Sequence, residues 1–429
     1  MQNMKKLSAL LFPVLFGAAA IAQNPISPMG VYIPDPSARV YDDGKMYVYG
    51  SLDVNDDSYC SDHYHVLSSD DLCQWTLDRD TFIWKENLYA PDMWYRGGKC
   101  YLYFDCPGGT EWMAVGDNPA GPFLNAERIE GPDQIDPNVF VDDDGQAYYF
   151  WGQFSGKGAK MNPDLKSIDM STMVDGLVTE KDHYFHEGSF VFKRGKYYYY
   201  TYASVRRRHQ PTCISYAMSE SPLGPYRYMG EIIDNAGCDP AVWNNHGSVV
   251  EFKGRWYVLY HRSTHGTRFM RKACIEPLTF REDGTIIEAE MTTQGASGPL
   301  DAYRNLDAAR ACLLHGDLQI RYDKASSREI LCIKDDGWAA YKYLEFSEEA
   351  PASVTIRVRP AKAGRIGVVA DQIYRGHIAE FDVPEGNGSD WVELTAQTEP
   401  GLTGVHAIFL EMSSDDRSGL DIDWIRFNR

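Results

Sequence analysis

Aromatic and polar positions alternate in a segment near the middle of the chain. Phe190, Phe192, Tyr198 and Tyr200 recur with a period of two on either side of the polar turn at 193–196. A period of two with a glycine-containing turn predicts a β-hairpin. A single glutamate, Glu187, stands just before this hairpin.

The same plan, a glycine-containing polar turn followed by an aromatic-rich strand, occurs five times. The turn glycines are Gly44, Gly98, Gly145, Gly195 and Gly254. They lie roughly 50 residues apart, which leaves room for four short strands, the content of one propeller blade. Helical periodicity is absent between residues 30 and 290. We therefore predict an all-β, five-bladed propeller over 23–291, although a β-sandwich with recurring hairpins suits the same spacing.

The pattern changes after residue 291. The polar, Gly- and Pro-bearing stretch 292–300 reads as a linker, and from residue 301 the alternation becomes aliphatic, as in "ASVTIRVRPA". Short alternating strands separated by turn signals predict a β-sandwich, jelly-roll-like domain over 301–429.

The first 22 residues differ from the rest of the chain. Lys5 and Lys6 precede an apolar run over 7–21, and Ala20 and Ala22 fit a signal-peptidase site. We expect a signal peptide over 1–22 and export to the periplasm or the extracellular medium. No later stretch approaches the ~20 apolar residues of a membrane span, so none is expected.

The amino-acid composition limits the classes of molecule that this protein is expected to bind. The formal net charge of −19 argues against nucleic acid, which requires clustered cations, and is compatible with a neutral polymer. Aromatic residues make up 13% of the chain and suit sugar stacking, although their first use is sheet packing. The nine cysteines are an odd number without framework spacing, so we expect mainly buried small hydrophobes; a Cys60–Cys73 bridge is the alternative.

A polar residue beside Pro or Gly precedes each of the five hairpins. These residues are Asp35, Asp92, Asp136, Glu187 and His246. One Asp-Pro pair usually marks only a turn. In a propeller, however, the strand nearest the axis opens each blade, so residues at equivalent starts converge around the central channel.

Converging carboxylates suit glycoside hydrolysis. One protonated acid protonates the leaving oxygen, and one ionised carboxylate activates water. A third carboxylate raises the pKa of the acid by repulsion.

At these positions the sequence resembles glycoside hydrolase family 43, five-bladed enzymes that remove arabinose, xylose or galactose units with inversion. The resemblance covers residues 30 to about 290, in the phrases "PDPSARV", "YAPDMWYRGGKCYLYF", "IDPNVFVDDDGQAYYFWG", "HEGSF" and "NNHGSVVEFKGRWYVLYH". It implies Asp35 as general base, Glu187 as general acid, and Asp136 as the residue that tunes and orients the acid.

The resemblance also implies a metal and an arginine. His246 matches a histidine near an axial ion, often Ca²⁺, for which water-mediated contact is expected because calcium prefers oxygen ligands; a hydrogen bond within the axis is the alternative. Arg271, in preference to Arg268, is expected near the acid-tuning carboxylate, where the alternative is a surface ion pair.

Three further residues are candidates for substrate binding. Trp94 and Trp151 follow the acid-bearing phrases and could form sugar-stacking walls, although core packing is the preferred interpretation of both. Asp92, one of the blade-opening acids, is expected to contact the substrate.

The C-terminal phrases "DDGWAAYKYLEF", "SVTIRVRP", "SDWVELTAQ" and "GLDIDWIRF" resemble family 6 carbohydrate-binding modules. This resemblance implies sugar binding and a structural Ca²⁺ near Asp421 or Asp423, although the usual acidic opening is replaced by "LDAYRNLDAARACLLHGD". Trp338 and Trp391 fit framework positions. A purely structural buttress is the alternative, and no organic cofactor is expected.

These observations predict an exo-acting, inverting glycosidase acting on side chains of plant cell-wall polysaccharides, with an oligo- or polysaccharide as its partner. An α-L-arabinofuranosidase is preferred over a β-xylosidase, β-galactosidase or β-galactofuranosidase. A non-catalytic sugar-binding protein and a protein scaffold are alternatives of another class. The basic cluster at 206–209 is expected in the loop after the Glu187 hairpin, bordering the pocket.

Overall fold

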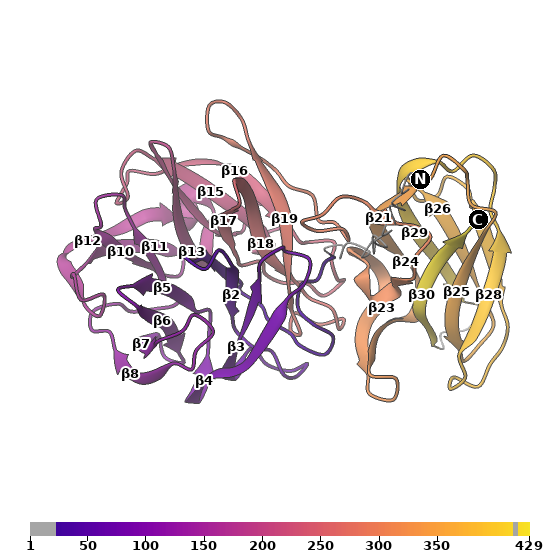
Figure 1. The fold of residues 1–429 in the computed structure, drawn as a ribbon, viewed down its shortest axis with the longest axis horizontal. Coiled ribbons are helices and arrows are strands. Elements are labelled where there is room, and N and C mark those ends of the chain that lie inside the picture. Colours follow the sequence, from indigo (N-terminus) through magenta and orange to yellow (C-terminus); the bar gives the residue numbers. More distant parts are fainter. Residues whose placement is uncertain (1–22, 415–418) are drawn as a thin grey trace, which may run out of the picture.

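The computed structural model describes residues 23–414 and 419–429, so the predicted signal peptide at 1–22 lies outside the described residues. Two β-rich units lie side by side (Figure 1). Short helices α1 (Glu180–His183) and η1 (Ala308–Arg310) interrupt the strands. None of the described helices is long and apolar enough to cross a membrane.

The first unit consists of five antiparallel sheets, each with four strands that are consecutive in the chain. Written from the first strand of each sheet, they are β1 (Ser37–Val40), β2 (Met46–Gly50), β3 (Ser61–Ser69), β4 (Thr76–Leu88); β5 (Asp92–Arg96), β6 (Lys99–Cys106), β7 (Thr110–Gly116), β8 (Leu124–Arg128); β9 (Asn138–Val141), β10 (Ala147–Trp151), β11 (Ser155–Met161), β12 (Ile168–Thr179); β13 (Phe185–Arg194), β14 (Tyr197–Ser204), β15 (Cys213–Ser219), β16 (Arg227–Asp234); β17 (Ser248–Phe252), β18 (Arg255–Arg262), β19 (Lys272–Phe280), β20 (Ile286–Ile287).

The first strands of the five sheets form a ring. Strand β1 contacts β5, β5 contacts β9, β9 contacts β13, β13 contacts β17, and β17 returns to β1. Hydrophobic clusters fill the spaces between neighbouring sheets; one of them joins Val48 and Leu67 of the first sheet to Leu259 and Ile275 of the fifth. This arrangement confirms the predicted five-bladed propeller.

The turn glycines are explained by the backbone. Each of the five joins the first two strands of a blade and has a positive φ, between +60° at Gly195 and +85° at Gly145. Glycine adopts this conformation without steric cost, which is why the repeat was visible in the sequence.

The second unit is a ten-stranded sheet with the main order β27-β26-β29-β24-β30-β25-β28. Its strands are β21 (Leu300–Asp301), β22 (Leu306–Asp307), β23 (Leu313–Asp323), β24 (Arg328–Phe346), β25 (Ser353–Pro360), β26 (Gly364–Ala370), β27 (Ala379–Val383), β28 (Val392–Gln397), β29 (Gly404–Ser414) and β30 (Leu420–Asn428). The edge strands β27 and β28 contact each other, so the sheet is nearly closed around its aliphatic core. The predicted β-sandwich is confirmed.

Strand β23 connects the two units (Figure 1). Its Leu314 and Ile320 donate backbone hydrogen bonds to the carbonyl oxygens of Gly237 and Thr264 in the propeller, at 2.9 and 2.8 Å. The segment 292–300 is packed against its surroundings, because Thr292 and Thr293 are buried and the Thr293 amide donates a hydrogen bond to the carbonyl oxygen of Lys342. The two units are therefore packed against each other by backbone pairing.

Candidate active site

A pocket of about 550 Å³ opens where the first strands of the blades converge. It is lined by five of the residues predicted from the sequence, namely Asp35, Asp136, Glu187, His246 and Arg271. Four different blades or their entry loops contribute these side chains, so the fold brings together acids that are up to 152 positions apart in the chain.

Asp35 is a buried, ionised carboxylate. Its Oδ1 accepts a hydrogen bond from Arg271 Nη1 at 2.9 Å, and its Oδ2 accepts one from Ser51 Oγ at 2.8 Å. Burial alone raises the pKa of Asp35, but the charge of Arg271 and the neighbouring His261 outweigh it and hold the pKa well below its usual range. An ionised carboxylate in a pocket can accept a proton from water.

The side chain of Arg271 is held in place by Asp53. Its Nε and Nη2 donate to the two carboxylate oxygens of Asp53 at 2.9 and 3.0 Å, while Nη1 reaches Asp35. The sequence prediction assigned this arginine to the acid-tuning carboxylate, Asp136. Arg271 pairs with Asp35 and Asp53 instead, because it directly precedes β19 in the fifth blade, which packs against the first blade.

Asp136 links the third and fourth blades. Its Oδ2 accepts a hydrogen bond from the backbone N–H of Gly188 at 2.8 Å, directly after Glu187. Burial, and then the charge of Glu187, raise the pKa of Asp136 well above its usual range. Asp136 therefore holds the backbone that carries Glu187 and interacts with it electrostatically.

Glu187 lies at a bulge of β13. The register of β13 against β14 shifts on both sides of Glu187, and Gly188 has a φ of +77°. A bulge re-aims a side chain out of the regular alternation, and here it directs Glu187 into the pocket. Glu187 Oε2 accepts a hydrogen bond from Gln153 Nε2 at 2.9 Å.

His246 packs between these acids. Its Nδ1 lies 3.8 Å from Asp35 Oδ1, and its ring lies so close to Gly188 that an added Cβ would come within 3.0 Å of it. Burial lowers the pKa of His246, so the imidazole is neutral. No cluster of three or more His, Cys, Asp or Glu among residues 23–414 and 419–429 could hold a metal ion. A neutral nitrogen is a poor direct ligand for Ca²⁺, and the water-mediated contact between His246 and an axial ion stays a prediction.

Comparison with known proteins agrees with this geometry. Residues 22–286 match the sequence model described as Glycosyl hydrolases family 43. The chain belongs to glycoside hydrolase family 43. Enzymes of this family are inverting glycosidases, so this chain is an enzyme rather than a binding protein or a scaffold. Residues 315–429 match Carbohydrate binding module (family 6), as predicted for the C-terminal domain.

Relatives of this family 43 protein match it over most of its length. It is 30% identical to a "Xylosidase/arabinosidase" of Thermoclostridium stercorarium, over 90% of this chain and 95% of the relative. It is 26% identical to an "Arabinoxylan arabinofuranohydrolase" of Paenibacillus polymyxa, over 90% of this chain and 71% of the relative. The fold matches the crystal structure of a Bacillus subtilis arabinoxylan arabinofuranohydrolase with a TM-score of 0.55 at 23% identity, over 95% and 98% of the two chains.

Three residues predicted to bind substrate in this family 43 site lie elsewhere. Trp151 is fully buried in the core between blades, and Trp94 packs with its ring 5.2 Å from the guanidinium of Arg39. Asp92 is buried and accepts hydrogen bonds from Ser37, Arg39, Asn138 and the amide of Val139, so its oxygens join the first three blades. None of the three lines the pocket as the structure describes it.

The pocket walls come from residues that the sequence reasoning missed. Tyr59 and Phe269 meet edge to face, with ring centroids 4.6 Å apart, and both line the pocket with Trp243. Tyr59 comes from the loop after β2 and Phe269 from the loop before β19, where no periodic pattern marks a role. Gln153, the partner of Glu187, also lies in a loop and carried no signal.

The two carboxylates predicted to hold calcium in the C-terminal domain are paired with arginines. Asp423 is buried and bonded to Arg328 at 2.7 Å and Arg357 at 2.5 Å, while Asp421 is bonded to Arg359 at 2.7 Å. Carboxylates that are neutralised by arginines do not fit a second cation. One face of the domain contains a pocket of about 490 Å³ lined by Trp338, which is thus not only a framework residue, and by Tyr374 and His377.

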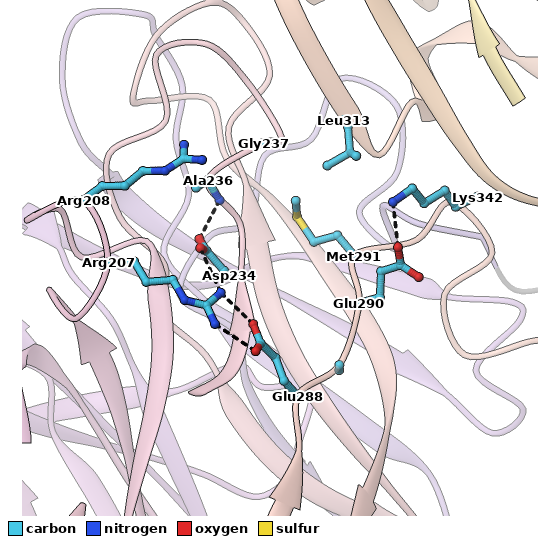
Figure 2. Close-up of a pocket in the computed structure, with 11 residues that line it drawn as sticks. Arg207, Arg208, Asp234, Ala236, Gly237, Glu288, Glu290, Met291, Leu313 and Lys342 are labelled. Carbon is cyan, nitrogen blue, oxygen red and sulfur yellow. Dashed lines mark hydrogen bonds and ion pairs between the residues drawn. The ribbon is translucent and has the colours of Figure 1, made fainter. Parts of the chain in front are cut away.

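The basic cluster at 206–209 borders a different pocket from the one predicted. Figure 2 shows Arg207 and Arg208 at a pocket of about 400 Å³ where the propeller meets the C-terminal domain. Arg207 forms a bidentate ion pair with Glu288 at 2.8 and 2.9 Å. The cluster therefore belongs to the junction between domains rather than to the acidic pocket.

Proposed function

We propose that the protein is an exo-acting α-L-arabinofuranosidase that removes terminal arabinose from side chains of plant cell-wall polysaccharides. The observation that carries the proposal is the electrostatic asymmetry of one pocket. Asp35 is held ionised by Arg271, while Glu187 lies beside the buried Asp136 and forms no ion pair with an arginine or lysine in the described part of the chain. Two carboxyls in different environments are what acid and base roles require.

In this mechanism Asp35 removes a proton from a water molecule as its oxygen attacks the anomeric carbon. Glu187 donates its proton to the leaving glycosidic oxygen in the same displacement, so the anomer is inverted. Asp136 keeps Glu187 oriented through the hydrogen bond that its carboxylate accepts from the Gly188 amide. Exchange with solvent then returns the proton from Asp35 to Glu187.

The sugar preference is supported by the relatives and by the pocket. Three relatives that match over at least 90% of this chain carry arabinosidase or arabinofuranohydrolase in their names. A pocket of about 550 Å³ suits a terminal sugar better than the middle of a chain. The second candidate is a β-xylosidase, because the first of these names includes xylosidase as well.

The test is hydrolysis of aryl α-L-arabinofuranoside, β-D-xyloside, β-D-galactoside and β-D-galactofuranoside by the protein and its Glu187→Ala variant, with the released anomer followed. We expect preference for the arabinofuranoside and an inverted product. The variant loses roughly 10²–10⁴-fold in rate with a poor leaving group and much less with an activated aryl group, which needs little protonation.

Glu180→Ala is the matched control. Glu180 lies on α1 within 3.9 Å of His186 but does not line the pocket, so we expect its leaving-group dependence to match the parent. Preference for the xyloside would select the second candidate. Equal losses on both leaving groups in Glu187→Ala would remove Glu187 from the acid role.

We also infer that the protein is exported. The support is the charged and apolar N-terminal sequence that ends at Ala22. N-terminal sequencing of the protein recovered from the periplasm or culture medium should begin at Gln23; recovery with Met1 in place would contradict this.

A further inference from the structure

A fourth carboxyl lies directly beneath the pocket. Asp105, near the end of β6, is fully buried, and its Oδ1 accepts a hydrogen bond from the backbone N–H of Asp136 at 3.3 Å. Its Oδ2 is buried without a hydrogen-bond partner. Asp105 was not a candidate in the sequence, because it sits inside an aromatic strand rather than at the start of a blade.

The groups around Asp105 are mostly acidic or neutral. The charges that act most strongly on it are those of Asp35 and Glu187, and Asp136 lies against it. Its buried titratable neighbours are Tyr64, Tyr89, Cys106, Glu111 and Tyr149, and burial is the main cause that raises the pKa of each. The guanidinium of Arg271 is committed to Asp35 and Asp53.

Two adjacent buried carboxyls cannot both be charged at low cost. Burial raises the pKa of both Asp105 and Asp136. Asp136 lines the pocket and accepts a hydrogen bond from the Gly188 amide at 2.8 Å, whereas Asp105 does not line it, its Oδ1 accepts a longer bond of 3.3 Å, and its buried Oδ2 has no donor. Hydrogen-bond donors favour the ionised form, so the geometry assigns the charge to Asp136 and the proton to Asp105.

We propose that Asp105 is a positioning residue that holds a proton in the working enzyme. As a neutral carboxylic acid, Asp105 holds the backbone of Asp136 in place by accepting a hydrogen bond from its amide, and it allows the Asp136 side chain to remain ionised beside Glu187. This inference rests on the proposed catalytic roles of Asp136 and Glu187, but its proton can be tested without any substrate.

The first test compares thermal unfolding of the parent and Asp105→Asn between pH 4.5 and 8. Asparagine keeps the size and the acceptor oxygen but cannot ionise. The unfolded chain loses the Asp105 proton near pH 4, while the folded chain keeps it. Ionisation therefore stabilises the unfolded state, and the free energy of unfolding of the parent falls as pH rises. We expect the Tm of Asp105→Asn to rise relative to the parent by several degrees across this range. A constant Tm difference would overturn the proton assignment.

The second test measures kcat and KM on the aryl glycoside that the parent hydrolyses. Asp105→Ala removes the acceptor of the Asp136 amide, and we expect kcat to fall at least tenfold with KM little changed, whereas Asp105→Asn keeps kcat within a few-fold of the parent. Full activity in Asp105→Ala would overturn the positioning role. A downward shift of the alkaline limb in Asp105→Asn would mean that Asp105 carries a charge.

Glu111→Ala is the matched control. Glu111 is the cross-strand partner of Asp105, is equally buried and is also acidic, but its carboxylate accepts a hydrogen bond from Tyr149 rather than from Asp136. We expect it to lower Tm as Asp105→Ala does while keeping kcat. Parallel losses of kcat in both alanine variants would reduce Asp105 to a packing role.

Discussion

Asp35 and Asp136 both adopt a left-handed backbone conformation, with φ of +55° and +62°, and both precede a proline. This region costs non-glycine residues of order 1 kcal/mol or more each, and such strain persists only where the surroundings fix it. Here the surroundings are Ser51, Arg271 and the Gly188 amide, which hold the two carboxylates. The strain therefore coincides with the two residues whose orientation matters most.

Arg271→Gln tests the electrostatic role of the guanidinium. Without it, the pKa of Asp35 rises, and since Asp35 acts as base only when ionised, the acidic limb of kcat/KM moves to higher pH. Asp35 and Asp53 also become unpaired buried charges, which costs about 3–5 kcal/mol of stability. The pH profile and thermal unfolding measure both effects.

Arg268→Gln is the control for this prediction. Arg268 lines the same pocket but is exposed and packs on the rings of Tyr59 and Phe269, 5.5 and 5.2 Å away. Its loss should leave the acidic limb in place. A matching shift in both variants would mean that general pocket charge, not the Arg271–Asp35 contact, sets the limb.

The sequence revealed the acids of the pocket but not their partners. Asp35, Asp136 and Glu187 occupy equivalent positions at the starts of their blades, so the repeat pattern in the sequence predicts that they lie in one pocket. The Asp53–Arg271 pair joins two residues 218 positions apart, in irregular loops. Such contacts depend on three-dimensional closure of the ring, which no local pattern encodes.

At the scale of elements, the fifth blade depends on close backbone approach at its first hairpin. In the β17–β18 hairpin, Gly254 occupies the turn with a φ of +77° and open space around it, whereas a Cβ on Gly247 would lie 1.9 Å from the carbonyl oxygen of Leu259. The two glycines are thus required for different reasons, one for its torsion angle and one for space.

Gly247→Ala and Gly254→Ala separate these reasons. Gly254→Ala should cost about 1 kcal/mol, because only the backbone conformation is unfavourable. Gly247→Ala must displace the backbone of β18, so we expect a clearly larger loss, seen as a lower Tm or as insoluble protein. Equal Tm losses would show that the hairpin shifts to accommodate the added carbon.

The elements themselves were largely predictable. Period-two aromatic runs with glycine turns gave the propeller, and aliphatic alternation gave the sandwich, because both signals reflect local geometry. The faces of individual aromatics were not predictable. Trp151 follows a catalytic-type phrase, yet it points into the core between blades, since which neighbour a strand packs on depends on the whole ring.

At the scale of the whole molecule, the ring is closed by contact between β1 and β17, and the C-terminal domain spans this closure. The carboxylate of Glu329, on β24, accepts a hydrogen bond from the Gly30 amide at 3.0 Å and pairs with the buried ammonium of Lys272 on β19. Lys272 also donates to the carbonyl of Pro28 at 3.0 Å. One residue of the second domain thus fastens the first blade to the last.

Glu329→Ala should therefore destabilise the propeller. It leaves the Lys272 ammonium buried and short of its carboxylate, at a cost of about 3–5 kcal/mol, measurable as a fall in denaturation midpoint. Glu290→Ala is the control, because the Glu290–Lys342 pair also lies at the junction but Glu290 is half-exposed. Its removal should cost less than about 1 kcal/mol. Comparable losses would mean that Glu329 acts only as a surface contact.

The position of Glu329 limits how this protein can be recombined. A module that is merely tethered can be exchanged between enzymes at its linker without consequence for the partner. If this propeller received a foreign module, it would lose the carboxylate that neutralises Lys272. If this module were attached to another propeller, Glu329 and the unpaired backbone edge of β23 would be exposed. The two domains should accordingly be inherited together, and engineered chimeras should retain the lysine and the glutamate as a matched pair.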